Sequence, residues 1–358
     1  MRNRSRTIRT VPGLAEAGLL NAQKAAEVEA VAHRYAISVT PAMQELISHR
    51  PDDPIAAQFV PSVLELAATP EESPDPIGDA RFTPVPGITH RYRDRVLLKP
   101  LHLCPVYCRF CFRREMVGPG QGLLGESELA AALDYIRSHP EIWEVILTGG
   151  DPLMLSARRL ERIVGELDRI PHVGVVRIHT RVPVVAPELV TADLRQALRT
   201  DTPVWIVVHC NHRQELGPKA RGALADLADG GFPLLSQTVL LKGVNDSVEA
   251  LEELFRELVR LRVKPYYLHQ GDLAPGTGHF RTSVAAGQEL VRRLRGPVSG
   301  LCQPTYVLDI PGGHGKVPIA AGYLERDELG YLVIDPQGVV HRYGPAAAEA
   351  DFPPAAQA

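Results

Sequence analysis

The sequence predicts an α/β fold with a parallel sheet, because apolar runs rich in β-branched residues alternate with amphipathic segments beyond residue 94. The six runs that predict strands are residues 96–99, 144–148, 175–179, 204–209, 234–239 and 265–269. The segments with helical spacing lie near residues 126–138, 156–169, 187–199, 214–229, 247–261 and 282–296. Such strand–helix repeats imply right-handed crossovers, and both a (β/α) barrel and a doubly wound sheet contain them.

Polar residues gather where the predicted strands end. They are Thr148–Asp151, His179–Arg181, His209, Gln237 and His269–Asp272. In (β/α) barrels the carboxyl ends of the strands carry the chemistry. We therefore expect one site that is assembled from several strand ends.

The sequence pattern divides the chain into an arm, a core and a tail. Residues 1–85 predict a helical and irregular arm that covers the core, residues 86–300 form the core, and residues 301–358 form a short C-terminal segment. The arm has helical spacing over 14–35, a proline-led helix start at Thr40-Pro41 and dense prolines from 51 to 86. The tail has a strand-like run at 305–309 and a hairpin at 331–341.

Composition excludes several classes of function. A formal charge of −3 over 358 residues gives no basic surface for nucleic acid. No apolar run approaches the roughly 20 residues that a membrane span needs, and no apolar signal core follows the basic N-terminus. Five cysteines in so long a chain argue against a disulfide framework, so we expect a cytoplasmic protein.

Three of the five cysteines, Cys104, Cys108 and Cys111, stand in a C-x3-C-x2-C pattern after the first predicted strand. A [4Fe–4S] cluster normally takes four thiolates, so three leave one iron open to bind a second molecule. The alternative is an incomplete zinc site or buried cysteines, but no second C-x2-C or histidine pair at zinc spacing stands nearby.

This cysteine pattern resembles the cluster loop of radical S-adenosylmethionine (SAM) enzymes. The resemblance implies that SAM chelates the open iron and is cleaved by reduction to a 5′-deoxyadenosyl radical. It also favours one fold over the other: a partial (β/α)6 TIM-like barrel, with an N-terminal helical extension and a short C-terminal segment.

A glycine-rich stretch, Pro311–Gly315, precedes Lys316. A phosphate loop would need glycine at 310 and a hydroxyl at 317, where the chain has Ile310 and Val317. Glycines before a lysine also allow a tight turn that aims the amine into a pocket, which suits covalent binding of pyridoxal phosphate (PLP). A surface glycine loop that ends in lysine is the alternative.

A basic segment, Arg91-Tyr92-Arg93-Asp94-Arg95, leads into the first core strand. Its guanidinium groups could bind a phosphate dianion bidentately, with the Tyr92 hydroxyl as a further donor. A solvated basic turn is the alternative interpretation when this segment is taken alone.

With the cluster loop, the Thr148–Leu153 motif, the basic segment and Lys316 in this order, residues 85–320 resemble the lysine 2,3-aminomutase family. The resemblance implies that the three cysteines hold the cluster and that Lys316 is the Schiff-base lysine. The residues implied for SAM are Gly149, Gly150, Asp151, His209 and Gln237, and those for PLP are Arg91, Tyr92, Arg95 and Lys316.

The resemblance also implies a substrate. Arg113 matches the family's carboxylate-binding arginine, and Asp272 and Asp309 match the aspartates that pair with the substrate's ε-ammonium, so lysine is favoured. His269 departs from several free-lysine enzymes, which have tyrosine there, and resembles the branch that modifies elongation factor P. No cysteine follows Cys302, so the zinc-binding tail of longer aminomutases is expected to be missing.

We therefore predict an isomerase that interconverts L-lysine and β-lysine by a radical mechanism. The alternatives are a supplier of β-lysine for elongation factor P, an enzyme for another amino acid, and a non-catalytic iron–sulfur protein. The expected partners are a free amino acid and an electron donor such as flavodoxin or ferredoxin. We also expect a homo-oligomer.

Overall fold

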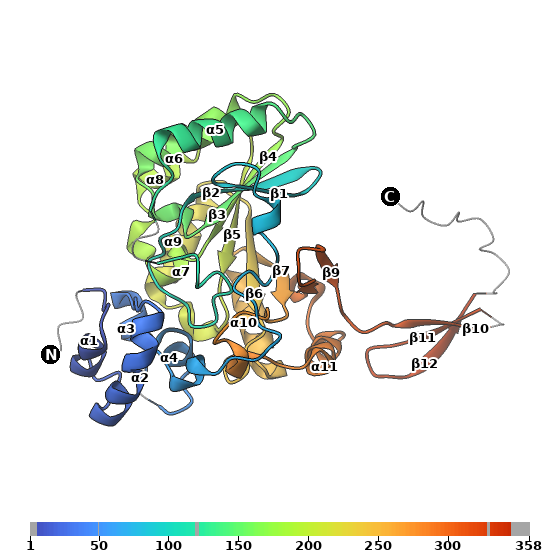
Figure 1. The fold of residues 1–358 in the computed structure, drawn as a ribbon. Coiled ribbons are helices and arrows are strands. Elements are labelled where there is room, and N and C mark those ends of the chain that lie inside the picture. Colours follow the sequence, from blue (N-terminus) through green and yellow to red (C-terminus); the bar gives the residue numbers. More distant parts are fainter. Residues whose placement is uncertain (1–5, 49, 119–121, 328–329, 345–358) are drawn as a thin grey trace.

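The computed structural model describes residues 6–48, 50–118, 122–327 and 330–344, and its centre is a curled sheet (Figure 1). The sheet contains β1 (Ile88–Tyr92), β2 (Arg95–Leu101), β3 (Glu144–Gly149), β4 (Val175–Thr180), β5 (Val204–His209), β6 (Leu234–Val239), β7 (Val263–His269), β8 (Thr305–Asp309) and β9 (Lys316–Pro318). These nine strands lie in chain order. Strands β2 to β8 pair in parallel, and β1 and β9 pair antiparallel at the two edges.

The six predicted strands are confirmed as β2 to β7, and the partial barrel is confirmed with them. The run at 305–309 adds β8 as a further parallel strand, so the sheet is wider than six strands. The two antiparallel edge strands were not predicted as members of this sheet. Because the order begins at β1 and ends at β9, the barrel stays open.

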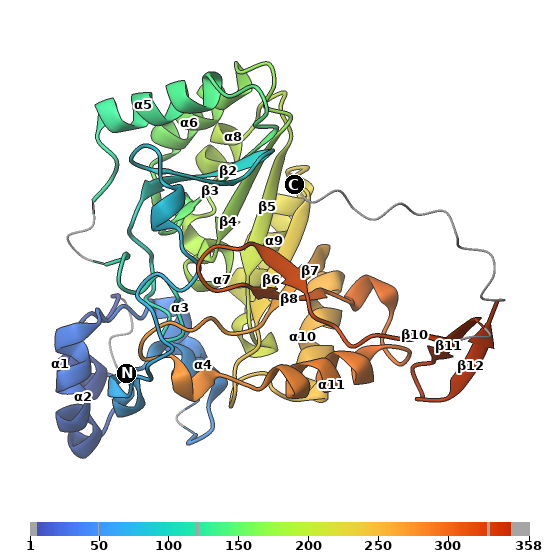
Figure 2. The ribbon, with the colours of Figure 1, turned by 45° about the vertical axis from the view of Figure 1, so that its right-hand side comes forward.

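Helices cover the outside of the curled sheet (Figure 2). They are α5 (Glu126–Arg137), α6 (Ala157–Asp168), α7 (Val182–Val185), α8 (Ala192–Ala197), α9 (Pro218–Asp229), α10 (Val248–Arg260) and α11 (Val284–Leu294). The predicted helix near 214–229 begins late, because Gly217 is the N-cap residue and Pro218 takes the first helical position. The short helix α7 contains proline in the run Val182-Pro-Val-Val and was not predicted.

The N-terminal arm packs beside the barrel as a group of short helices (Figures 1 and 2). They are α1 (Val11–Glu16), α2 (Ala22–Arg34), α3 (Pro41–Leu46) and α4 (Pro54–Phe59). The predicted helical run 14–35 is two helices, because Gly18 adopts a φ of 74° and Asn21 caps α2 by accepting from the Lys24 N–H at 2.8 Å. The helix start at Pro41 is confirmed.

Short 3-10 turns connect these elements. They are η1 (Val63–Leu66), η2 (Ala80–Phe82), η3 (Pro152–Met154), η4 (Pro187–Leu189), η5 (Arg213–Glu215), η6 (Gly278–Phe280) and η7 (Gly300–Cys302). In η1, Ser62 and Glu65 form a capping box, in which each side chain accepts from the backbone at the other end of the turn.

Side-chain alternation along the strands separates the core from the inside of the barrel. On β3, Val145 and Leu147 are fully buried in the main apolar core, while Ile146 and Thr148 line an internal cavity. The same core cluster includes Leu14 of α1 and other residues of the arm. The arm therefore shares its core with the barrel.

The tail forms a separate antiparallel sheet that extends from the body in both views (Figures 1 and 2). Its strands are β10 (Leu324–Asp327), β11 (Gly330–Ile334) and β12 (Val340–Tyr343). The predicted hairpin is confirmed as β11 and β12, with Ile334 opposite Val340. None of the helices in the described ranges is both long and apolar enough to cross a bilayer.

Candidate active site

A cavity of about 840 Å³ runs along the inside of the curled sheet, from the starts of β2 and β3 at Arg95 and Glu144 to the carboxyl ends of the parallel strands. This volume is in the range of cofactor and ligand sites. All of the residues that the sequence predicts for the site line this one cavity. They are Arg91, Tyr92, Arg95, Cys104, Cys108, Cys111, Arg113, Gly149, Gly150, Asp151, His209, Gln237, Asp272, Asp309 and Lys316.

The three cysteines lie half-buried on the loop after β2, whose backbone is tied to the arm. The Tyr107 N–H donates to the Ser38 carbonyl at 3.3 Å, and the Arg109 N–H donates to the Gln58 carbonyl at 2.9 Å. Burial raises the pKa of all three thiols, that of Cys111 to about 11. A soft donor set of this kind fits an iron–sulfur cluster, whose irons hold the thiols as thiolates.

The same cysteines do not converge on a single metal ion. Across the described residues, no group of three His, Cys, Asp or Glu side chains has the geometry for one ion. A cubane needs a different arrangement, because each thiolate binds a different iron.

A buried acid from the arm holds the cluster loop in place. Glu65 in η1 is fully buried and accepts from Arg109 Nε at 2.9 Å and from Arg114 Nη2. Burial opposes its ionisation, but the two guanidinium groups lower the pKa of Glu65 below its usual value. Arg114 also lies 3.5 Å from the centre of the Tyr35 ring. The pairing gives two arginines of the cluster loop a shared carboxylate partner.

The end of β3 must be glycine because it packs against the backbone of the cluster loop. A Cβ at Gly150 would lie 2.2 Å from the Leu103 carbonyl oxygen. Gly149 has a φ of 102°, and a Cβ there would lie 2.7 Å from the Leu101 oxygen. The two glycines bring the strand end directly against the residues that precede the cysteines.

Asp151 follows these glycines and is almost fully buried. Its Oδ1 accepts from the Leu153 N–H at 3.1 Å and the Thr180 hydroxyl at 2.7 Å. Its Oδ2 accepts from the N–H groups of Arg181 and Val182 at 2.7 and 3.1 Å. These four donors use the four lone-pair positions of a carboxylate, so Asp151 fixes the turn between β4 and α7.

His209 ends β5, and Gln237 lies opposite it in register, two residues before the end of β6 at Val239. Burial, with Arg181 as the next cause, lowers the pKa of His209 well below its usual value, so the imidazole is neutral. Its Nε2 lies 3.2 Å from the Asn211 Oδ1, which places the proton on Nε2. Its ring centre lies 5.7 Å from that of Phe110 on the cluster loop.

The predicted PLP residues come from β1, β2 and β9. The Tyr92 hydroxyl accepts from the Lys316 backbone N–H at 2.8 Å, and the Arg95 guanidinium lies 3.8 Å from the centre of the Tyr92 ring. Arg91 Nη2 donates to the Ile77 carbonyl at 2.6 Å and to Asp79 Oδ1 at 2.7 Å. A hydroxyl, two guanidinium groups and a lysine thus lie on one wall of the cavity.

The antiparallel register of β8 and β9 places Lys316 directly opposite Asp309. The intervening turn requires glycine, since Gly313 has a φ of 81° and a Cβ there would lie 2.7 Å from the Phe82 ring. Lys316 Nζ donates to Asp309 Oδ2 and lies 3.2 Å from His269 Nδ1. Burial opposes ionisation of Asp309, but these two neighbours lower its pKa below the usual value.

Asp272 is the second acid predicted for the substrate ammonium, and its pKa is shifted upward, in the opposite direction to that of Asp309. Burial, with the nearby Asp309 as the next cause, raises the pKa of Asp272 to about 7. Arg113, the predicted carboxylate ligand, donates to Asp79 Oδ2 at 3.0 Å. Asp79 therefore joins Arg113 to Arg91 through its two oxygens, and it is almost fully buried.

Several buried nitrogens that belong to this cavity have no hydrogen-bond partner within the described chain. They are the Nε atoms of five arginines and the Nε2 atoms of two histidines, namely Arg91, Arg113, Arg177, Arg181, Arg281, His179 and His269. Because buried donors and acceptors are normally paired, such atoms indicate a polar ligand. The donor set therefore fits an anionic cofactor with a phosphate and a carboxylate-bearing substrate.

Sequence reasoning missed several residues of the site. Asp79 stands in the proline-rich arm, and no motif marks it. Arg181 was noted only as part of a polar strand end, yet it contacts the sulfur of Cys108 at 2.7 Å. His269 was recognised as a departure from the family, and the structure places it beside Lys316.

The sequence profile of the Radical SAM superfamily matches residues 98–258. An L-lysine 2,3-aminomutase from Clostridium subterminale is 42% identical over 309 residues, which cover 86% of this chain and 74% of that protein. The enzyme of the same name from Acetoanaerobium sticklandii is 42% identical over 309 residues, with 86% and 75% covered. A glutamate 2,3-aminomutase from Clostridioides difficile is 38% identical over 282 residues, with 79% and 67% covered.

The matched lengths include most of this chain and most of each relative. The residues that carry the resemblance also line one cavity inside a partial barrel. The chain belongs to the lysine 2,3-aminomutase family of radical SAM enzymes, which are isomerases that use a [4Fe–4S] cluster, SAM and PLP.

Proposed function

We propose that this enzyme interconverts L-lysine and β-lysine by moving the amino group from carbon 2 to carbon 3. The observation that carries the proposal is the charge arrangement of the cavity, with Arg113 for a carboxylate and two acids, Asp272 and Asp309, for a second ammonium. The names of the two relatives at 42% identity agree with it.

The cofactor sites follow from the donors that line the cavity. Cys104, Cys108 and Cys111 would hold the cluster, and Gly149, Gly150, His209 and Gln237 would surround SAM. Asp151 acts indirectly, by fixing the turn beside them, since its own oxygens already accept four hydrogen bonds. When bound, the cofactors would supply a 5′-deoxyadenosyl radical for hydrogen abstraction and a conjugated pyridine ring that can stabilise a radical during migration of the amino group.

The wall formed by β1, β2 and β9 would hold PLP. Arg91 and Arg95 would bind the phosphate and Tyr92 would add a hydroxyl donor, while Lys316 supplies the amine. Covalent binding requires neutral Lys316 Nζ. Burial and the lysine charge lower the pKa of His269, so its ring is neutral and its Nδ1, 3.2 Å from Nζ, can accept a hydrogen bond from the amine.

Asp309 would serve two cations in turn. Without substrate it pairs with Lys316 Nζ. With the substrate bound, its ammonium would take the position near Asp309 and Asp272, while Arg113 would bind its carboxylate. Burying an ammonium between two carboxylates keeps it charged, and this arrangement selects against an acidic side chain. The walls of the cavity around these groups would orient the β-carbon and exclude water.

The alternative within the family is another amino acid, or β-lysine supplied for elongation factor P. One relative, 38% identical to this chain, is named glutamate 2,3-aminomutase, so similar proteins include one that is named for a different amino acid. His269 is the observation that favours the elongation factor P branch. We further propose a cytoplasmic homo-oligomer that receives electrons from a flavodoxin or ferredoxin.

The deciding experiment is anaerobic reconstitution with iron, sulfide, SAM, PLP and dithionite, followed by incubation with L-lysine. We expect β-lysine, separated from α-lysine by chromatography after derivatisation. Parallel incubations with L-glutamate, L-ornithine and L-arginine test the other substrates. The Lys316→Ala variant should lack both the product and the PLP absorbance band. Turnover of another amino acid with no reaction of lysine would refute the role of the two aspartates.

A further inference from the structure

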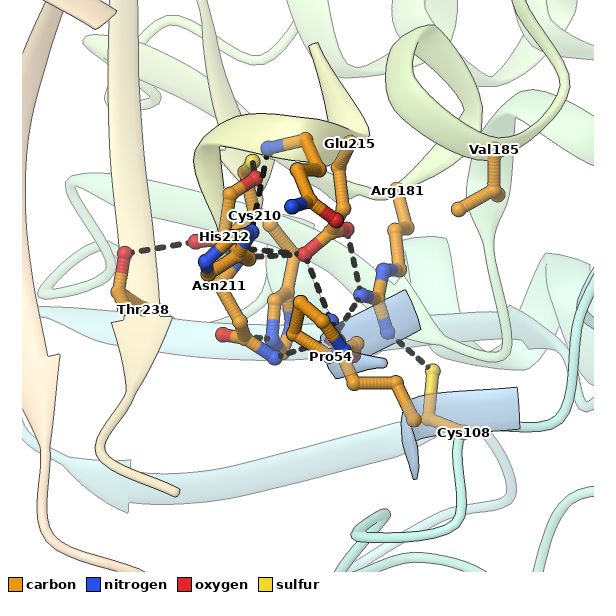
Figure 3. A network of polar contacts seen from close by, with 12 residues as sticks. Pro54, Cys108, Arg181, Val185, Cys210, Asn211, His212, Glu215 and Thr238 are labelled. Carbon is orange, nitrogen blue, oxygen red and sulfur yellow. Dashed lines mark hydrogen bonds and ion pairs between the residues drawn. The ribbon is translucent and has the colours of Figure 1, made fainter. Parts of the chain in front are cut away.

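A buried polar network connects Cys108 to the arm, to the end of β4 and to the loop after β5 (Figure 3). At its centre is Arg181, whose Nη1 donates to Cys108 Sγ at 2.7 Å. Its other terminal nitrogen, Nη2, donates to Glu215 Oε2 and to Gln58 Oε1, each at 2.7 Å. Glu215 and Gln58 are fully buried, and Arg181 is 6% exposed.

The two partners of Arg181 are themselves fixed. Glu215 Oε1 accepts from the N–H groups of Asn211 and His212 at 2.9 Å and from Gln58 Nε2 at 3.1 Å. Asn211 Nδ2 donates to Gln58 Oε1 at 3.0 Å. A guanidinium group surrounded in this way has one available position, so its contact with the sulfur is built into the fold.

Aromatic rings complete the surroundings of the guanidinium. Its central carbon lies 4.7 Å from the centre of the Phe59 ring and 5.3 Å from that of Phe110. These rings keep water away, so the charge of Arg181 is weakly screened at Cys108. The ion pair with Glu215 uses Nη2 alone, which leaves Nη1 available to donate to the sulfur.

Hydrogen bonds to the sulfurs and nearby charges set the reduction potential of iron–sulfur clusters. A fixed cation one hydrogen bond from a ligand sulfur stabilises the reduced cluster, because reduction adds negative charge. The negative charge of Glu215 disfavours reduction of the cluster. Glu215 contacts Nη2, whereas Cys108 contacts Nη1, so the cation is nearer to the sulfur than the carboxylate is.

We propose that Arg181 is a positioning residue that raises the reduction potential of the cluster by donating to Cys108, with Glu215 as its counter-charge. The proposal rests on the proposed function in one respect, namely that Cys108 is a cluster ligand. It also gives the arm a role in the redox centre, because Gln58 on α4 orients the guanidinium.

The test compares Arg181→Gln, Arg181→Lys and Glu215→Gln with the wild-type protein, all reconstituted anaerobically. The matched control is Arg195→Gln, which removes an exposed ion pair with Asp226. The ratio of reduced to oxidised cluster is measured by electron paramagnetic resonance at fixed potentials and normalised to cluster content.

For Arg181→Gln we expect at least a tenfold lower ratio of reduced to oxidised cluster, which corresponds to about 59 mV for one electron. Glu215→Gln should change the ratio in the opposite direction, since the cation then has no counter-charge. Arg181→Lys keeps the charge and should give a smaller change than Arg181→Gln. The control should titrate like the wild type.

These opposite signs distinguish tuning from mere structural support, which would lower cluster content in both variants without opposite shifts. If Arg181→Gln and Glu215→Gln hold the cluster but its potential is unchanged, or shifts in the same direction in both, the role of Arg181 is refuted and the proposed function is not affected. Failure of the wild type to take up any cluster overturns the proposed function as well. Should Arg181→Gln hold too little cluster to titrate, Glu215→Gln decides: a higher ratio supports the inference and an unchanged one overturns it.

Discussion

Asp272 gives the sharpest test of the electrostatics in the cavity. Burial, with Asp309 as the next cause, raises its pKa from an ordinary 3.8 to about 7. At a pH between 3.8 and about 7, the Asp272 carboxyl is ionised in the unfolded chain but still protonated in the folded chain. The Asp272 contribution to stability is therefore fully present below about pH 4, falls as the pH rises, and stays constant above about pH 7.

The magnitude follows from the size of the shift. Roughly three pKa units at about 1.36 kcal/mol each amount to about 4 kcal/mol over the whole range. About half of this, roughly 2 kcal/mol, is lost between about pH 5.5 and about pH 8. Asparagine has no proton to lose at this position. The free energy of unfolding of Asp272→Asn, relative to that of the wild type, should therefore rise by this amount over the same pH interval.

The assay is urea unfolding of the cofactor-free protein at the two pH values, followed by circular dichroism. Any change in packing caused by the amide is the same at both pH values, so it cancels when the two differences between variant and wild type are subtracted. Asp193→Asn, at an exposed position of α8, is the control. A difference between Asp272→Asn and wild type that does not change with pH would show that this carboxyl is not perturbed by burial.

Two further substitutions test how the cluster loop is held. Gly150→Ala should prevent cluster assembly and lower the melting temperature, because the new Cβ would lie 2.2 Å from the Leu103 carbonyl oxygen; iron content after reconstitution measures the first effect. Normal iron content would mean that β3 does not press against the loop. Glu65→Gln should lower the free energy of unfolding by about 3–5 kcal/mol, since it leaves Arg109 and Arg114 buried without a charge partner. Urea unfolding measures this loss, and a loss below about 1 kcal/mol would contradict it.

Periodicity alone predicted the core strands of the fold, because a parallel strand buried on both faces is a short apolar run of recognisable length. The breaks in the helical segments depended on single residues. Gly18 and Asn21 divide the first helical run, and Pro218 delays the start of α9. The edge strands β1 and β9 could not be predicted as such, since pairing at an edge is decided by tertiary contacts and not by local pattern.

For the site, spacing predicted the residues that stand in motifs or at strand ends, and these do line one cavity. It could not predict how their charges are balanced. Asp309 faces Lys316 only because β8 and β9 pair in one register, and the sequence contains no sign of that register. Asp151 lines the cavity, and its oxygens also accept from four donors of its own chain, which no motif in the sequence indicates.

The arm has a larger role than covering the barrel. Three of its polar side chains, Gln58, Glu65 and Asp79, are at most 2% exposed, and each accepts hydrogen bonds from arginines of β1, of the cluster loop or of the end of β4. These arginines are Arg91, Arg109, Arg113, Arg114 and Arg181. Buried cations that lose their partners are strongly destabilising, so the arm and the charged wall of the cavity must form together. The short helices of the arm are therefore part of the redox and anion-binding centre, although no motif in their sequence indicates it.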